Sequence, residues 1–222
     1  MKWLRRLLPS DPDTVPLSRS AQAAEVVDEL VHMAHLLVRG GYTPRAEIVA
    51  HVEDLAVEDG LDPDLFDAQG LVAREIADLK AEQLNWSSQT DWDRLDAAME
   101  ALELQGIVAR QDFLCCGNCG MDAIVGELDK HDALGGRRAR GYVFFHQQDT
   151  DSAVEGRGLY FNYGHADDRA TDAQHAGIGR ELVRALEAAG LEPEWNGSLD
   201  RRIAVRLNWQ RRWVERRSTP PG

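Results

Sequence analysis

All three cysteines of this 222-residue chain lie within five positions, as Cys115, Cys116 and Cys119. Thiolates are soft metal ligands and redox nucleophiles, and both chemistries need sulfurs that are close together. The two-residue gap between Cys116 and Cys119 lets one turn deliver two sulfurs to one ion. Cys115 adds a third if its side chain turns away from the strand before it. The spacing therefore indicates a candidate site with three alternative interpretations.

The first interpretation is a zinc site, which needs a fourth ligand. The candidates are His131, His146 and His165, and their spacing from the cysteines does not choose among them. The chain has no second Cys-x-x-Cys pair that would complete a common zinc motif. We take His146 as the candidate that joins Cys115, Cys116 and Cys119.

The second interpretation is thiol redox chemistry. Residues 116–119 lie between a strand-like and a helix-like run, where a helix N-terminus would lower a thiol pKa. The surroundings lack a cis-proline candidate typical of thioredoxin-like proteins. The third interpretation leads: reduced cysteines packed in a tight turn that Gly117 and Gly120 make flexible.

A second polar group follows an aromatic run at residues 142–146. Strand alternation places Tyr142, Phe144 and His146 on one face. If the next strand forms a hairpin with this one, polar side chains from both strands meet near a glycine loop. The predicted ligand-binding residues are His146, Gln148, Asp149, Tyr160 and Asn162.

Helical periodicity dominates the chain before the cysteines. Apolar residues recur at helical spacing up to Gly40, and start signals at Thr43-Pro44, Asp62-Pro63 and Thr90 predict three more helices. The first two of these helices end at Asp59 and Leu84, and the third ends before Gly106. Residues 1–20 are expected to be a flexible segment, and residues 21–106 a helical region.

The period becomes strand-like after Gly106. Strands are predicted at 107–113, 142–146, 159–163, 192–195 and 203–207, with helices at 121–129 and 178–189. This order predicts an α+β fold, in which a helical N-terminal half precedes a small, mostly antiparallel, split βαβ-like sheet with two helices. Residues 107–213 form the α+β region, and 214–222 the tail.

Composition limits the function classes. The chain is 43% hydrophobic with a net charge of −13, which disfavours nucleic-acid binding despite an arginine-rich stretch at 201–217. No run approaches the ~18 apolar residues of a membrane span, so we expect no membrane partner. An odd number of cysteines suits a reducing compartment and predicts a cytoplasmic protein. Together with the net charge and the lack of a membrane span, it predicts a soluble, acidic protein.

Several motifs resemble a family of uncharacterised bacterial proteins known only as a domain of unknown function. They are the run from Gly106 to Phe113 leading into Cys115-Cys116-x-x-Cys119-Gly120, the run from Gly141 to Asp149, Gly158-Leu159-Tyr160, Gly179-Arg180-Glu181 and Glu194-Trp195. The resemblance spans roughly residues 20 to 213. It implies no catalytic residues, because no activity is known for the family.

The sequence therefore predicts a non-catalytic binding or protein-interaction module with a protein or small-molecule partner and no cofactor. The alternative is a zinc-binding or thiol-redox protein centred on the cysteines. Whether the chain is an enzyme stays open at this point.

Overall fold

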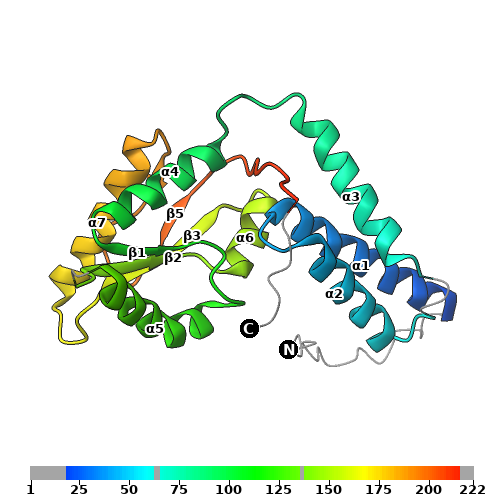
Figure 1. Cartoon of the computed structure of the whole chain (residues 1–222), viewed down its shortest axis with the longest axis horizontal. Helices are drawn as coiled ribbons and strands as arrows, with labels where there is room; N and C mark the ends of the chain where they lie inside the picture. The colour runs from blue at the N-terminus through cyan, green and yellow to red at the C-terminus, as the bar shows by residue number, and fades with distance from the viewer. Residues whose placement is uncertain (1–18, 63–65, 136–137, 216–222) are drawn as a thin grey trace, which may run out of the picture.

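The computed structural model describes residues 19–62, 66–135 and 138–215. Within these ranges, seven helices and five strands form an α+β fold, with a helical N-terminal half followed by the sheet (Figure 1). The predicted fold class is confirmed. No helix in the described part of the chain combines the length and apolar character needed to cross a bilayer.

Three helices build the first core: α1 (Arg19–Gly40), α2 (Arg45–Glu58) and α3 (Ala68–Gln83). Their inward faces are almost entirely aliphatic, and Ile48, Val52 and Val72 are fully buried. The start of α3 corrects the prediction. Its N-cap is Asp67, whose carboxylate accepts from the Gly70 N–H at 2.7 Å, rather than Asp62. Similarly, Pro44 and not Thr43 is the N-cap of α2.

The sheet has the strand order β1-β2-β3-β5-β4. Its strands are β1 (Ile107–Arg110), β2 (Gly141–Phe144), β3 (Leu159–His165), β4 (Pro193–Glu194) and β5 (Ile203–Val205). Only β1 and β2 pair in parallel, through the crossover helix α5 (Gly117–Gly135). The other pairs are antiparallel, as predicted for most of the sheet.

Helices cover the two sheet faces unequally. On one face, α4 (Asp91–Leu104) and α7 (Asp172–Ala188) enclose the largest core, in which Val143, Phe145 and Phe161 are buried. On the other face, α5 contacts β1 and β2, and Ile124 meets Phe144. The α4 helix thus packs with the sheet and not with α1–α3. The domain division at residue 106 stays a prediction.

The segment between β2 and β3 departs from the prediction. We expected a strand to His146 and a hairpin, but the strand ends at Phe144 and a third helix of this region, α6 (Gln147–Val154), follows. Its N-cap is His146, and the carboxylate of Asp149 accepts the His146 backbone N–H at 3.1 Å. This capping box favours a helix start over a longer strand.

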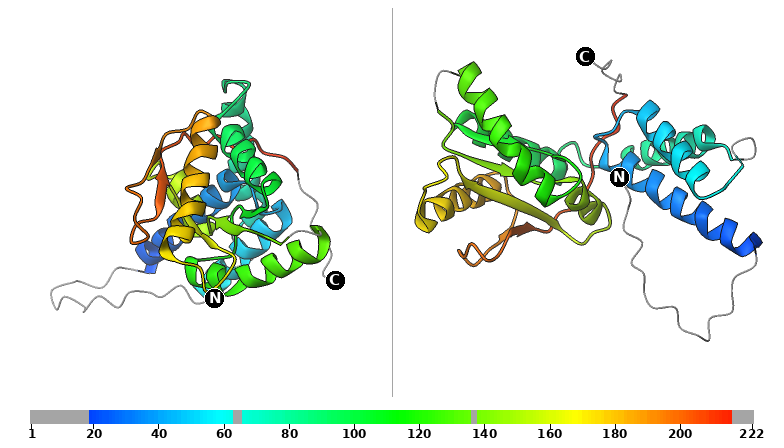
Figure 2. Two further views of the ribbon diagram at one scale, coloured as in Figure 1. Left: turned by 90° about the vertical axis from the view of Figure 1, so that its left-hand side faces the viewer. Right: turned by 90° about the horizontal axis from the view of Figure 1, so that it is seen from below.

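The C-terminal segment at 206–215 connects the two cores (Figure 2). Trp209 donates its indole N–H to the Arg39 carbonyl at 2.9 Å, and Trp213 is buried in the core of α1–α3. The chain therefore returns to its N-terminal half after completing the sheet. The remaining residues of the predicted tail, 216–222, and most of the predicted segment 1–20 lie outside the described residues.

Candidate cysteine-centred site

The cysteine loop runs beside the end of β2. The Phe113 N–H donates to the Phe145 carbonyl at 2.8 Å, and the Gln147 N–H donates to the Leu114 carbonyl at 3.0 Å. Asp112 and Leu114 both adopt positive φ, at 51° and 60°, which is uncommon for residues with a side chain. Residues 107–113 are therefore not one continuous strand. The two turns direct the following cysteines towards the start of α5.

The three sulfurs meet at the N-terminus of α5. Cys115 Sγ and Cys119 Sγ are 3.4 Å apart, and all three sulfurs lie within 4.8 Å of one another. Cys116 immediately precedes the helix, and its carbonyl accepts from Gly120 at 3.0 Å. The helix starts four residues earlier than predicted, so Cys119 belongs to its first turn. All three thiols are free and only partly buried.

Cys116 and Cys119 differ in proton affinity. The backbone N–H of Cys119, followed by the neighbouring thiols, lowers the pKa of Cys116. Hydrogen bonding with Cys115 and Cys116, together with burial, raises the pKa of Cys119 to about 12. Cys116 therefore ionises more readily than Cys119.

Two glycines let the cysteine helix approach the sheet. A Cβ at Gly120 would lie 2.5 Å from the Phe144 ring, so only glycine fits there. A Cβ at Gly117 would lie 3.5 Å from His146 Nε2 and 4.0 Å from Asn162 Oδ1. The cysteine element thus lies against two of the residues predicted from the second polar group.

His146 belongs to a buried polar chain. Its Nε2 is 3.1 Å from an oxygen of Asp149, and the two residues are only 6% and 4% exposed. Arg202 donates two hydrogen bonds, of 2.9 and 2.6 Å, to the same carboxylate. Burial, with the charge of Arg202, lowers the pKa of His146 despite the opposing effect of Asp149. The imidazole is therefore neutral near pH 7.

Two buried polar atoms in this region have no hydrogen-bond partner. They are Nδ1 of His146 and Nδ2 of Asn162, two of three such side-chain atoms in the described part of the chain. The register pairs Phe144, the last residue of β2, with Asn162 in the middle of β3, and His146 follows Phe144 by two residues. An unpaired buried polar atom costs about 1–3 kcal/mol, which marks this region as one built for more than packing.

The structure brings together most of the predicted site residues. Asn162 and His146 lie beside Gly117, and the Tyr160 carbonyl accepts from Arg202 at 2.6 Å. His146 is not a member of the sulfur group. Gln148 is exposed on α6. Of the alternative histidines, neither His131 nor His165 joins the sulfur group either.

Arg202 was missed from the sequence. It belongs to an arginine-rich stretch that we interpreted as a solvated surface. Its role depends on the pairing of β3 with β5, which places it beside Asp149, 53 residues earlier in the chain. Its position immediately before a predicted strand was the only available signal.

These features define an α+β protein with a three-cysteine cluster beside a buried His146–Asp149 pair, to which the exposed Arg202 binds. The chain belongs to the DUF6891 family, described as a domain of unknown function, whose model matches residues 23–213. The predicted resemblance is thereby confirmed. No curated protein and no solved structure matches the chain.

Proposed function

We propose that this protein is a binding module organised around a metal centre in which Cys115, Cys116 and Cys119 hold one zinc ion. The observation that supports this most strongly is the mutual distance of the sulfurs, all within 4.8 Å. Four ligands arranged tetrahedrally at ~2.3 Å from zinc lie about 3.8 Å from one another. The 3.4 Å contact between Cys115 and Cys119 needs only a small adjustment to reach that spacing.

The chemistry of the donors favours zinc over harder cations. Thiolates bind soft and borderline metals, whereas magnesium and calcium prefer oxygen. Metal binding would also release the thiol protons, because the ion binds deprotonated sulfurs. A reducing compartment such as the cytoplasm would keep the three thiols available.

Three protein ligands leave a fourth position for a water molecule, a bound ligand or His146. A centre with three protein ligands and one exchangeable position is typical of zinc sites that bind or activate a small molecule, while structural sites are closed. His146 Nε2 is already occupied by Asp149. We therefore assign the fourth position to an exchangeable ligand. His146 and Asn162 would then be polar residues beside the metal centre.

Metal analysis of the full chain, purified under reducing conditions without a histidine tag, tests this proposal. We expect about one zinc per chain, and cobalt substitution should give thiolate-to-cobalt charge-transfer absorption. Cys116→Ser should abolish both signals. Asn118→Ala is the matched control, because Asn118 lies between the ligands on the exposed side of the turn. Absence of both zinc and cobalt binding in the reduced wild-type chain would refute the proposal.

Thiol redox chemistry is the second candidate, favoured by the lowered pKa of Cys116 beside two further thiols. With a small-molecule disulfide as oxidant, the Cys116 thiolate would attack one sulfur and release a thiolate. A neighbouring cysteine would then lose its proton and displace the second thiolate, leaving a protein disulfide. Mass spectrometry after equilibration with glutathione buffers tests this. A mass loss of two hydrogen atoms at mildly reducing potentials, in metal-free protein, would support it.

A further inference from the structure

The loop that presents the cysteines has an unusual backbone at two positions. Asp112 and Leu114 lie in the left-handed region, with φ of 51° and 60°, and among the described residues they are the only non-glycine residues with positive φ. This conformation is strained for a residue with a side chain, more so for leucine than for aspartate. It persists only where neighbouring groups hold it. The contacts of these two residues therefore identify what positions the sulfurs.

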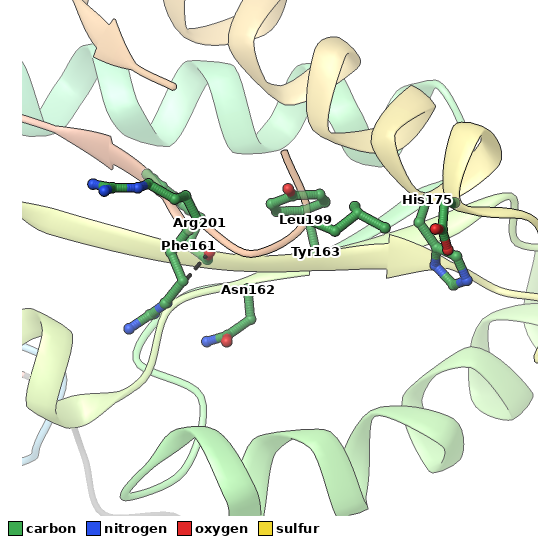
Figure 3. A pocket seen from close by; sticks show the side chains of 8 residues that line it. Phe161, Asn162, Tyr163, His175, Leu199 and Arg201 are labelled. Carbon is green, nitrogen blue, oxygen red and sulfur yellow. Dashed lines mark hydrogen bonds between the residues drawn. The ribbon is translucent and has the colours of Figure 1, made fainter. Parts of the chain in front are cut away.

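The sheet side of the cysteine element supplies packing. Gly117 lies against His146 and Asn162, which are the neighbours that a Cβ at this glycine would meet within 4.0 Å. Figure 3 shows Asn162 pointing from β3 towards α5, and its amide nitrogen has no hydrogen-bond partner among the described residues. Packing of this kind limits how closely α5 approaches the sheet. It does not determine the direction of the loop before the helix.

Hydrogen bonds from α6 hold the loop at both left-handed residues. The Gln147 N–H donates to the Leu114 carbonyl at 3.0 Å. The Thr150 hydroxyl donates to Oδ1 of Asp112 at 2.6 Å. The first bond uses only backbone atoms, whereas the second depends on the identity of two side chains. Thr150 is 2% exposed, so water cannot easily replace its hydroxyl as the donor.

The orientation of Thr150 is itself fixed by α1. Gly40 is the last residue of α1, and a Cβ at that position would lie 3.2 Å from Cγ2 of Thr150. The methyl group of the threonine thus lies against α1 while its hydroxyl bonds to Asp112. A β-branched side chain with both branches in contact keeps a single rotamer. Thr150 is therefore a rigid link between the helical scaffold and the cysteine loop.

We propose that Thr150 is a positioning residue for the cysteine centre, because its hydroxyl holds Asp112 in the left-handed conformation that brings the three sulfurs together. The inference rests on the proposed function and deepens it. It assigns part of the affinity of the centre to a side chain on α6, which acts through Asp112 and not by binding the ligand itself.

Phenylarsine oxide measures the spacing of the sulfurs without a metal ion. Its arsenic forms bonds to two thiol sulfurs, and its oxygen leaves with the two thiol protons as water, so two thiols must lie close together. Competition with ethanedithiol gives the affinity for the reduced full chain. Thr150→Val should weaken the binding of both this arsenical and cobalt by about tenfold or more, as loss of groups that support metal ligands does. Thr150→Ser keeps the hydroxyl and should bind both as the wild type does.

Thr90→Val is the matched control. Thr90 is also 2% exposed, and its hydroxyl also donates to a carboxylate, that of Asp93 at 2.9 Å, but it precedes α4. This variant should leave both affinities unchanged. A second pair of variants decides the question if Thr150→Val does not fold, which circular dichroism reports. Asp112→Asn retains an acceptor oxygen and tolerates positive φ, so it should bind nearly as the wild type does, whereas Asp112→Ala should weaken binding.

The two proposals can fail separately. If the wild type binds the arsenical but neither zinc nor cobalt, the metal centre is refuted, and the arsenical affinities of the variants still test the role of Thr150. The inference is overturned if the wild type does not bind the arsenical, or if Thr150→Val binds it as tightly as Thr150→Ser does. Equal weakening in Thr90→Val and Thr150→Val would also overturn it, because the effect would then follow from general destabilisation.

Discussion

The α1–α3 region and the sheet region bury different kinds of side chain. The core of α1–α3 contains aliphatic residues and Trp213, and its charged groups, such as Arg39 and Glu82, pair near the surface. The sheet region buries His146, Asp149 and Thr150. Burying polar groups is costly unless they are paired, so a fold keeps them where they have a role. The difference indicates that the first region is a scaffold and the second carries the site.

The joint, by which we mean the contact of Arg211 with Tyr42 and Trp92 between the α1–α3 region and the sheet region, is polar and aromatic. Arg211, only 5% exposed, lies over the Tyr42 and Trp92 rings at 3.7 and 4.7 Å from their centroids, and donates to the Gly40 carbonyl. Tyr42 follows α1, Trp92 is in α4, and Arg211 comes from the C-terminal segment. Three distant parts of the chain therefore meet at one guanidinium.

The largest expected effect comes from Asp149→Ala. It would leave Arg202 without its buried partner and remove the capping carboxylate of α6. We expect the free energy of unfolding in urea to fall by about 3–5 kcal/mol. Asp168→Ala, at an exposed position, should change it by less than about 0.5 kcal/mol. Similar losses in the two variants would mean that the buried contacts of Asp149 add no stability. The contrast between the sheet region and the α1–α3 region would then fail.

Arg211→Ala tests the joint. Loss of two cation–π contacts and a buried hydrogen bond should lower the free energy of unfolding by about 2–3 kcal/mol. Arg211→Lys should restore little of it, because an ammonium cannot stack on both rings in the same way. We also expect the urea transitions followed by tryptophan fluorescence and by circular dichroism to separate. Coincident transitions would show that other contacts of the C-terminal segment hold the regions together.

Periodicity predicted most of the scaffold because helix packing is a local, repeated pattern. The apolar spacing before Gly40 and the Thr90 capping box located two helices correctly. Strand alternation also placed Tyr142 and Phe144 together and Val143 and Phe145 on the opposite face, as the two cores show. The cysteine cluster was evident from spacing alone.

The site was only partly predictable because its contacts are tertiary. Histidine is an unusual N-cap, so the start of α6 at His146 was read as more strand. The meeting of Gly117 with His146 and Asn162 depends on the parallel crossover from β1 to β2. The partner of Asp149 became visible only after β5 was placed beside β3. Apart from the three-residue spacing of His146 and Asp149 in the α6 capping box, these contacts leave no local sequence signal.

A pH effect is expected where α6 faces α1. Burial, followed by the charges of Asp112 and Glu155, raises the pKa of Asp151 to about 6, against the opposing charges of His32 and Arg157. The folded state then binds this proton more tightly than the unfolded state does. Its free energy of unfolding should fall as pH rises from about 4 to 6, and stay low above that range.

Asp151→Asn should remove this pH dependence and raise stability at pH 7 by about 1–2 kcal/mol, the full shift being reduced by partial solvent screening. Urea denaturation at a series of pH values measures it. Asp54→Asn, at an exposed position on α2, should leave the pH profile unchanged. An unchanged profile in Asp151→Asn would show that Asp151 is not the source of the pH dependence.

The smallest expected effect comes from Thr90→Ala, which tests whether α4 belongs to the sheet region or to the α1–α3 region. Thr90 accepts the Asp93 N–H at 3.2 Å, and Asp93 accepts the Thr90 N–H at 2.7 Å and Arg212 at 2.9 Å. Thr90→Ala should lower the free energy of unfolding by about 1 kcal/mol. Because α4 packs with α7 and β1, hydrogen exchange should increase in these elements while α1–α3 stay protected. Increased exchange in α1–α3 instead would assign α4 to the helical scaffold, and the contrast between the two regions would then begin at β1.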